Sequence, residues 1–412
     1  MEKKKMELLA PAGDLEKLKT AVIYGADAVY FGGEAFSLRA GADNFSQEEM
    51  REGIRFAHDH GVKCYMTINI FPHNEDVLPI QEYLLRIRNL GVDAFLVSDP
   101  GMFDILKEVM ADAEVHLSTQ ANMTNWRTGL FWARMGVKRM VLARELTLTE
   151  ISEIRQHLPE DIELEAFVHG AMCISYSGRC LLSNFMTGRD SNRGMCAHPC
   201  RWKYALMEEK RPGEYYPVEE DDRGTYIMNS GDLCMIEHIA DMDRAGISSL
   251  KIEGRMKSVF YVATTVGAYR KAIDDYYDGR PFDRSLLEEV SKVSHRKFTT
   301  GFFYNKPSGE DQDYLTSDYV REYAFAGKVL SYDENSGMAT VEQRNKMVIG
   351  DEIEVFGPGA PFFKQKIEVM LDENGEPISS APHAQQIVKI KMDQPAGENY
   401  LIRKKKTDKV MK

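Results

Sequence analysis

The sequence predicts a (β/α)8 barrel of the TIM type, interrupted by a cysteine-rich insertion and followed by a small all-β domain. Three observations predict it. In the first 255 residues, helices that end at a glycine are followed at once by apolar runs. One long interruption carries five of the six cysteines, and the sequence after Phe325 alternates between apolar and polar residues and is rich in turns. A chain of 412 residues is long enough for two or three domains.

Each barrel repeat is predicted from a helix closed by glycine and the apolar run behind it. Glycine adopts the left-handed conformation that ends a helix, and nearly continuous apolar runs are typical of parallel strands covered on both faces. Five such runs follow Gly25, Gly61, Gly91, Gly136 and Gly246. Three further strands, at Met6–Ala10, Glu114–Gln120 and Ile162–Gly170, bring the number to eight. Helices are expected between the early strands, at Asp14–Tyr24, Gln47–His60 and Asp76–Leu90.

An open, doubly wound α/β sheet is the alternative to a closed barrel. Such a sheet needs a glycine-rich, phosphate-binding turn after its first strand. The turn Pro11-Ala12-Gly13-Asp14 is a poor match. Eight strands alternating with helices therefore favour the (β/α)8 barrel.

Domain boundaries follow from the change of pattern along the chain. We expect the barrel over residues 1–280, with the insertion at about 171–245, on the loop side where barrels build their sites. A helical connector over 281–322, with a helix at Arg284–Val293, leads to an all-β barrel domain over 323–405. A basic tail covers 406–412, and we expect the basic residues from Arg403 onward to be a solvated chain end.

Charge and hydropathy exclude two broad classes. A net charge of −12 argues against a general nucleic-acid coat, although a local basic patch can still grip an RNA. No apolar run of 18 residues is present, so we expect no membrane span. The N-terminal apolar stretch is too short for a signal peptide, which predicts a cytoplasmic protein. In that compartment cysteines indicate metal or redox chemistry rather than structural disulfides.

The insertion gathers cysteines at irregular spacing. Cys173 and Cys180 form C-x6-C, Cys196 and Cys200 form C-x3-C, and Cys234 stands alone. Soft thiolates suit zinc or an iron–sulfur cluster, and the spacing is not that of a zinc ribbon. Unlinked buried thiols and a redox disulfide are the alternatives. Cys64 lies within a strand run, which is typical of a small buried thiol.

Polar residues near the ends of the predicted strands are the candidate catalytic residues, because barrel active sites lie there. We single out Arg144, Glu165, His169, Glu253 and Arg255, within a larger set that includes Asn69, Gln120 and Lys251. Arg144 and Arg255 rank highest, since guanidinium groups bind a dicarboxylate or a phosphate through paired hydrogen bonds. The alternative is that these groups pair with one another in the barrel mouth and that His169 is a core histidine.

A cluster of basic residues near the cysteines is the candidate RNA-binding surface. It consists of Arg189, Arg193, Arg201 and Lys203, interleaved with the aromatic residues Tyr176, Phe185 and Trp202. Aromatic side chains stack on unpaired bases, and cations bind the phosphates. A solvated charged face is the equally simple alternative.

Several long motifs carry a family resemblance. The stretch EAFVHGAMCISYSGRCLLSNF from Glu165 is followed by NRGMCAHPCRWKY, NSGDLC and LKIEGRMKS, and LLAPAGD stands near the start. These motifs resemble the collagenase-like peptidase family of unknown catalytic type, and within it most resemble the prephenate-dependent tRNA uridine hydroxylation proteins.

The resemblance implies a [4Fe–4S] cluster and a C-terminal β-barrel like a translation-factor accessory domain. Matched motif by motif, it assigns the cluster to Cys173, Cys180, Cys196 and Cys234, with Cys200 as the alternative fourth ligand. It also implies tRNA as a partner, a redox partner, and prephenate or a compound derived from it as co-substrate.

Three functions are therefore weighed. The first is an iron–sulfur enzyme that hydroxylates wobble uridine in tRNA to 5-hydroxyuridine. The second is a peptidase, which needs an activated nucleophile or a metal-bound water; no G-x-S-x-G or H-E-x-x-H motif is present. The third is a binding module whose cysteines hold a structural metal. The oligomeric state is not predicted.

Overall fold

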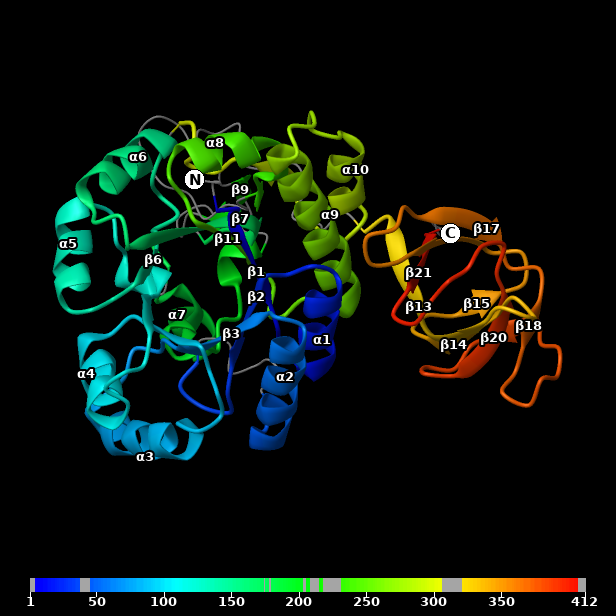
Figure 1. Ribbon diagram of the computed structural model, residues 1–412, viewed down its shortest axis with the longest axis horizontal. Coiled ribbons are helices and arrows are strands. Elements are labelled where there is room, and N and C mark those ends of the chain that lie inside the picture. Colours follow the sequence, from blue (N-terminus) through cyan, green and yellow to red (C-terminus); the bar gives the residue numbers. More distant parts are fainter. Residues whose placement is uncertain are drawn as a thin grey trace.

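The first domain is a closed ring of eight parallel strands with helices outside it (Figure 1). The computed structural model describes residues 4–37, 45–173, 175–177, 179–202, 205–207, 215–217, 231–305 and 321–406. The ring strands are β1 (Glu7–Pro11), β2 (Ala28–Gly32), β3 (Lys63–Ile68), β4 (Ala94–Val97), β5 (Val115–Leu117), β6 (Arg139–Val141), β7 (Glu163–Ala171) and β11 (Ser249–Ile252). Because β11 pairs in parallel with both β1 and β7, the ring closes. The predicted (β/α)8 barrel is confirmed, and the open sheet is excluded.

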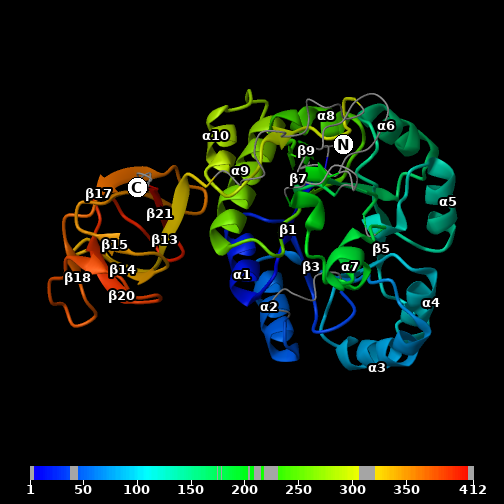
Figure 2. The same ribbon diagram turned by 180° about the vertical axis from the view of Figure 1, so that it is seen from behind.

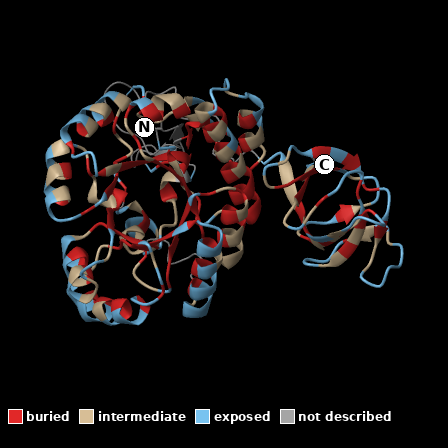
Figure 3. Cartoon of the chain, viewed as in Figure 1, coloured by how far each residue is buried: buried red, intermediate tan, exposed pale blue. Residues whose placement is uncertain are grey.

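The outer layer consists of helices, most of which begin at a residue whose side chain caps the first turn. They are α1 (Leu15–Ile23), α2 (Gln47–Asp59), α3 (Val77–Ile87), α4 (Pro100–Val109), α5 (Trp126–Arg134), α6 (Leu148–His157), α8 (Ile239–Arg244) and α9 (Val259–Tyr277). Asp14 caps α1, and Ser46 and Thr147 start α2 and α6 with capping boxes. Figure 3 shows the buried ring strands enclosed by helices whose outer faces are exposed.

The turn after β1 requires a glycine at position 13, because another part of the backbone lies against it. A Cβ on Gly13 would lie 1.9 Å from the backbone oxygen of Arg255, so only glycine lets this turn approach the end of β11. Asp14 then caps α1 by accepting the backbone N–H of Lys17. The turn therefore brings two strand ends together, which a phosphate-binding turn would not require.

The insertion between β7 and β11 extends the barrel wall at the end where β7 stops. Its described elements are α7 (Leu182–Thr187), β8 (Ala205–Met207), β9 (Tyr215–Pro217) and β10 (Asp232–Cys234). Strand β10 pairs antiparallel with the end of β7, and β12 (Phe298–Thr299) pairs with β10. Arg193 joins both oxygens of Asp76, at 2.9 and 3.0 Å, which ties the insertion to the loop after β3.

The second domain is an antiparallel β structure that follows α10 (Ser285–Ser291). Its seven-stranded sheet has the order β17-β16-β21-β13-β14-β20-β18. The bounds are β13 (Tyr323–Asp333), β14 (Met338–Gln343), β16 (Glu352–Phe356), β17 (Phe363–Lys366), β18 (Met370–Leu371), β20 (Ile387–Lys391) and β21 (Leu401–Lys405), and β15 (Met347–Val348) pairs with β19 (Ser380–Ala381). The predicted all-β domain is confirmed.

The two domains meet along α1, α9 and α10, as the view from behind also shows (Figure 2). Phe356 and Leu401 of the second domain belong to the core of the barrel domain. Around them, Glu16 of α1 lies 2.6 Å from Arg344, and the Tyr24 hydroxyl donates to the backbone oxygen of Asn399. This interface is both apolar and charged.

The expectation of a solvated end from Arg403 onward is wrong. Arg403 lies within β21, is 0% exposed, and donates from Nε to Glu354 at 2.8 Å and from Nη2 to Glu289 at 2.9 Å. A run of basic residues looks solvated in the sequence because the two acidic partners lie 49 and 114 positions away. In the described residues, no helix is long and apolar enough to cross a bilayer.

Replacing Arg403 by methionine is expected to lower the free energy of unfolding by about 3 kcal/mol, because it leaves two carboxylates without their guanidinium at a buried contact. Chemical denaturation measures the change. Lys366→Met is the control, since Lys366 is largely exposed and its nearest carboxylate oxygen is 3.7 Å away. Equal changes in the two variants would contradict the buried pairing.

Candidate functional site

A cavity of about 120 Å³ opens at the carboxyl ends of the barrel strands, beneath the insertion. Strand ends and the insertion both contribute to its wall. The lining residues used below are Tyr30, Thr67, Asn69, Leu96, Ser118, Gln120, Val141, Arg144, Phe167, Lys251, Glu253 and Arg255 from the barrel, and Cys173, Ser177, Cys180, Ser191 and Cys196 from the insertion. Three cations and one carboxylate line this cavity, so its charge favours an anionic ligand.

The neutral part of the wall is a hydrogen-bonded group of short side chains. Asn69 donates to Ser118 at 3.1 Å and to Gln120 at 3.0 Å. Arg255 is buried and donates from Nη1 to Ser37 at 2.7 Å and to Thr67 at 3.0 Å. These contacts hold amides, hydroxyls and the guanidinium in place before any ligand enters.

Lys251 and Glu165 form a buried ion pair at the base of the cavity. Lys251 Nζ lies 2.7 Å from Glu165, whose other carboxylate oxygen accepts from Ser249 and Arg139 at 3.2 Å each. Burial alone would raise the pKa of Glu165, but Lys251 and Arg139 hold it below its usual value. Burial lowers the pKa of Lys251, and Glu165 opposes that effect.

Glu165, a candidate catalytic residue, is thus 0% exposed and does not line the cavity. The structure makes it a partner of Lys251 rather than a group that meets a ligand. Glu253 does line the cavity, as do Arg144 and Arg255. The sequence pattern placed all of them at strand ends but could not show that Glu165 lies one layer deeper than Phe167 along β7.

The cysteines of the insertion converge on the cavity from three turns. Cys173, Cys180 and Cys196 all line it, although they span 24 residues of the chain. Each sulfur accepts an N–H: Cys173 from Arg144 Nη2 at 3.2 Å, Cys180 from Leu182 at 3.4 Å, and Cys196 from His198 at 3.4 Å. Such donors stabilise thiolates and are typical of the surroundings of iron–sulfur clusters.

Arg144 is the residue that joins the strand ends to this cysteine loop. Besides Cys173 it donates to the backbone oxygen of Ala171 at 2.8 Å and to Ser177 at 2.7 Å, and its guanidinium lies over the Phe167 ring. Arg144 therefore positions the loop and its first cysteine. Its predicted task, to bind a carboxylate, competes with these three contacts.

The two remaining cysteines of the insertion do not line the cavity. Cys234 ends β10 opposite His169 and is buried, and burial raises its pKa to about 11. Cys200 is partly exposed and lies in the short helical turn Pro199–Arg201, which contacts α7. The structure thus brings three of the four expected ligands to the cavity and places neither candidate for the fourth, Cys234 or Cys200, among the residues that line it.

His169, a candidate acid or base, lies away from the cavity. It is 1% exposed and packs against the rings of Tyr261, Tyr269 and Phe298. The register between β7 and β11 slips by one residue after Phe167, so the alternation that would aim position 169 into the barrel is broken. Burial lowers the pKa of His169 to about 3, and the ring stays neutral. The core-histidine alternative fits the structure.

The candidate RNA-binding residues have separate surroundings. Arg189 is exposed at the end of α7, whereas Arg193 is engaged with Asp76. The side chain of Arg201 and all of Lys203 lie outside the described residues. Among the interleaved aromatic residues, Phe185 is 88% exposed, and Tyr176 and Trp202 are about half exposed.

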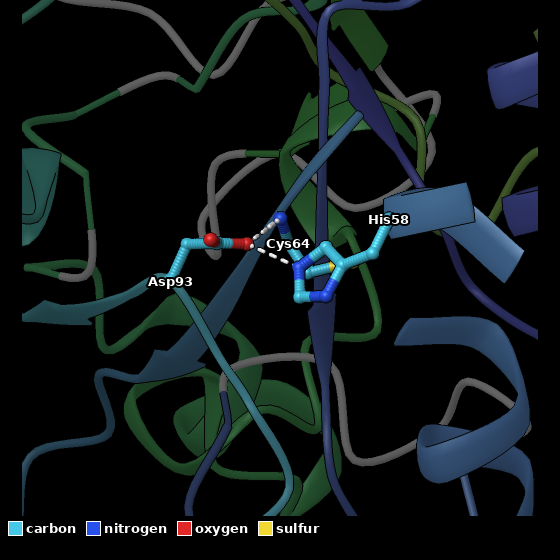
Figure 4. A group of neighbouring side chains, drawn as sticks. All are labelled: His58, Cys64 and Asp93. Carbon is cyan, nitrogen blue, oxygen red and sulfur yellow. Dashed lines mark hydrogen bonds and ion pairs between the residues drawn. The ribbon is translucent and has the colours of Figure 1, made fainter. Parts of the chain in front are cut away.

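A second group of metal-type side chains lies at the opposite end of the barrel (Figure 4). His58 Nε2 is 2.8 Å from Asp93, whose same oxygen accepts the backbone N–H of Cys64. Cys64 is fully buried, and burial raises its thiol pKa, which opposes ligation. Among the described residues, no three sulfurs of the insertion lie close enough together to form a comparable single-ion group.

The sequence pattern missed the hydroxyl residues of the site. Thr67, Ser118 and Ser177 each hold a catalytic candidate or a neighbour of one. Serine and threonine are too common near strand ends to stand out. Only their position in the sequence could have indicated them: Thr67 is the second-last residue of β3, and Ser118 follows the last residue of β5.

Wild-type stability is expected to fall as the pH drops from about 6.5 towards 3, in part because of His169. Its folded pKa is about 3, whereas the unfolded ring takes a proton near pH 6.5, so protons favour the unfolded chain in that window. Unfolding free energies at several pH values measure this. His169→Gln should show a shallower decline; parallel curves would contradict the neutral, buried ring.

Comparison with known proteins shows which family the chain matches. A model of peptidase family U32 matches residues 13–313, and a model of the C-terminal domain of that family matches residues 321–403. A protein of Bacillus subtilis (strain 168) named tRNA hydroxylation protein P1 is 47% identical over 406 residues, which cover 98% of this chain and 96% of that protein.

Two further relatives show how varied the names in the family are. A collagenase of Porphyromonas gingivalis (strain ATCC BAA-308 / W83) is 33% identical over 88% of this chain and 89% of its own length. The 23S rRNA 5-hydroxycytidine C2501 synthase of Escherichia coli (strain K12) is 33% identical over 74% of this chain and 46% of its own length. The resemblance drawn from the cysteine motifs is confirmed: the chain belongs to peptidase family U32.

Proposed function

We propose that this protein hydroxylates wobble uridine in tRNA to 5-hydroxyuridine, with a [4Fe–4S] cluster bound by the insertion. The observation that supports it most is the convergence of Cys173, Cys180 and Cys196 on one cavity wall, each sulfur with an N–H donor. Relatives named for hydroxylation of tRNA and of rRNA support the reaction class.

The donor set fits a cluster better than a single zinc ion. The residues that would hold it are Cys173, Cys180, Cys196 and, as the fourth, Cys234, with Cys200 as the alternative. A thiolate cage around four irons is wider than the first shell of one zinc ion, and no three of the described sulfurs of the insertion lie close enough together for that shell. When bound, a cluster supplies one-electron redox chemistry, with a redox partner as the source of electrons.

The chain's own residues would bind and orient the reactants. Arg144 fixes the cysteine loop, and the cationic wall of Arg144, Lys251 and Arg255 favours a carboxylate co-substrate, prephenate or a compound derived from it. The RNA would approach over the insertion, where Arg189 and the exposed ring of Phe185 lie. A base drawn out of its stack can then reach the cavity.

The peptidase alternative has little support from this cavity. None of the residues found to line it is a histidine, and His169 is held against Tyr261 and Tyr269. A thiol–imidazole pair of Cys173 with His169 would need a base that faces the same space. The alternative predicts proteolysis that survives the loss of iron.

Metal analysis tests the cluster. Protein purified without oxygen is expected to contain about four iron and four sulfide per chain. Cys173→Ala, Cys180→Ala and Cys196→Ala should lose most of both, and Cys234→Ala compared with Cys200→Ala identifies the fourth ligand. Cys64→Ala is the matched control and should keep the full content. Zinc in place of iron would refute the proposal.

Nucleoside analysis tests the reaction. In a strain that lacks its own uridine-hydroxylating activity, the wild-type gene is expected to restore 5-hydroxyuridine in tRNA, as measured by mass spectrometry of digested tRNA. Cys173→Ala should reduce the modification at least about 100-fold, and Cys64→Ala should leave it unchanged. Full modification by a Cys173→Ala protein without iron would separate the reaction from the cluster.

A further inference from the structure

Lys251 is a buried cation at the base of the cavity whose hydrogen-bonding capacity is only partly used. An ammonium group has three N–H donors. Among the described residues, Lys251 has one hydrogen-bond acceptor, Glu165 at 2.7 Å, and otherwise faces the rings of Tyr30 at 4.3 Å and Phe167 at 5.5 Å. It is 2% exposed, and it lines the cavity. A group so deeply buried normally satisfies its donors, so an acceptor from outside the chain is expected.

The two arginines of the cavity are less available. The Nη atoms of Arg144 donate hydrogen bonds to Ala171, Ser177 and Cys173. Arg255 directs Nη1 at Ser37 and Thr67. These hydrogen bonds of both guanidinium groups go to groups of this chain, whereas Lys251 lines the cavity with a single hydrogen-bond acceptor among the described residues.

The positive charge of Lys251 is stabilised by Glu165, which lies beneath it in the barrel. Glu165 accepts from Lys251, Ser249 and Arg139, and Arg139 also donates to Glu7 and Glu163. A carboxylate bound by three donors stays ionised and keeps its neighbour an ammonium. Glu165 thus supplies the counter-charge without entering the cavity.

We propose that Lys251 anchors the carboxylate of a small hydroxy- or oxo-carboxylic acid at the base of the barrel cavity. Leu96, Val141 and the two rings give the walls an apolar surface for the carbon body of the ligand. The amides and hydroxyls of Asn69, Ser118 and Gln120 face its oxygen functions. This proposal rests on the proposed function, because the ligand is taken to be the co-substrate of that reaction. It assigns recognition of the ligand's carboxylate to Lys251 instead of to the two arginines.

Calorimetry on the full-length protein, purified without oxygen and with no RNA present, tests the anchor. The probes are prephenate, 4-hydroxyphenylpyruvate and shikimate. At least one is expected to bind, and Lys251→Met should weaken its binding about 10- to 100-fold, the range for a charge-assisted hydrogen bond. Lys138→Met is the matched control, because Lys138 lies on the surface beside Asp161. Binding of none of the three probes would overturn the proposal.

The methyl esters of 4-hydroxyphenylpyruvate and shikimate separate an anchor from a structural role. If Lys251 holds the carboxylate, esterification weakens binding to the wild type and hardly affects binding to Lys251→Met. An equal ester penalty in both proteins overturns the proposal. Should Lys251→Met fold poorly because Glu165 is left unpaired, Lys251→Met/Glu165→Gln removes both charges and gives the same comparison.

The outcome is separate from that of the proposed function. Ligand binding that depends on Lys251, in a protein that restores no 5-hydroxyuridine, would support the anchor and contradict the hydroxylation of tRNA. Restored 5-hydroxyuridine with ligand binding indifferent to Lys251 would do the reverse.

Discussion

The interior of the barrel depends on one buried guanidinium. Arg139 rises from β6, is 3% exposed, and donates to Glu7 of β1 and to Glu163 and Glu165 of β7. Three strands of the ring are thereby joined by charge as well as by backbone hydrogen bonds. A guanidinium suits this place because its planar donors can serve several carboxylates at once and do not lose their proton when buried. Removing it would leave the buried Glu165 and the partly buried Glu7 and Glu163 without the cation that they share.

This network also prepares the cavity above it. One carboxylate oxygen of Glu165 accepts hydrogen bonds from Arg139 and Ser249. The other oxygen accepts from Lys251 and positions it at the cavity base. The stabilising ion pairs and the cavity residues are therefore neighbours along β7 and β11. In barrels the residues at one end commonly serve stability and those at the other end form the active site. The same strand carries Glu165 for the network, Phe167 for the cavity wall and, beyond the register slip, His169 for the packing against α9.

The insertion is held to the barrel by two arginines with different tasks. Arg144, from the end of β6, binds the start of the insertion and contacts Cys173, while Arg193 reaches back from the insertion to Asp76. Cys180 lies between these two contacts, and Cys196 follows the second contact by three residues. A loop fixed at both ends keeps the thiolates close to the strand ends, and it spares the chain part of the entropy cost of ordering them when a metal binds.

The sequence by itself determined the barrel, the all-β domain and the family, because these depend on local periodicity and on long motifs. Glycine-closed helices and apolar runs predict each strand, and eight of them predict the closed ring. Only the tertiary structure decided that Glu165 lies beneath the ligand space, that His169 packs outside it, that Arg403 is buried, and that Cys234 is not among the residues that line the cavity. Each of these depends on a partner far along the chain or on a one-residue register slip. A pattern of period two cannot show such a slip, and a charge in a sequence does not reveal its partner.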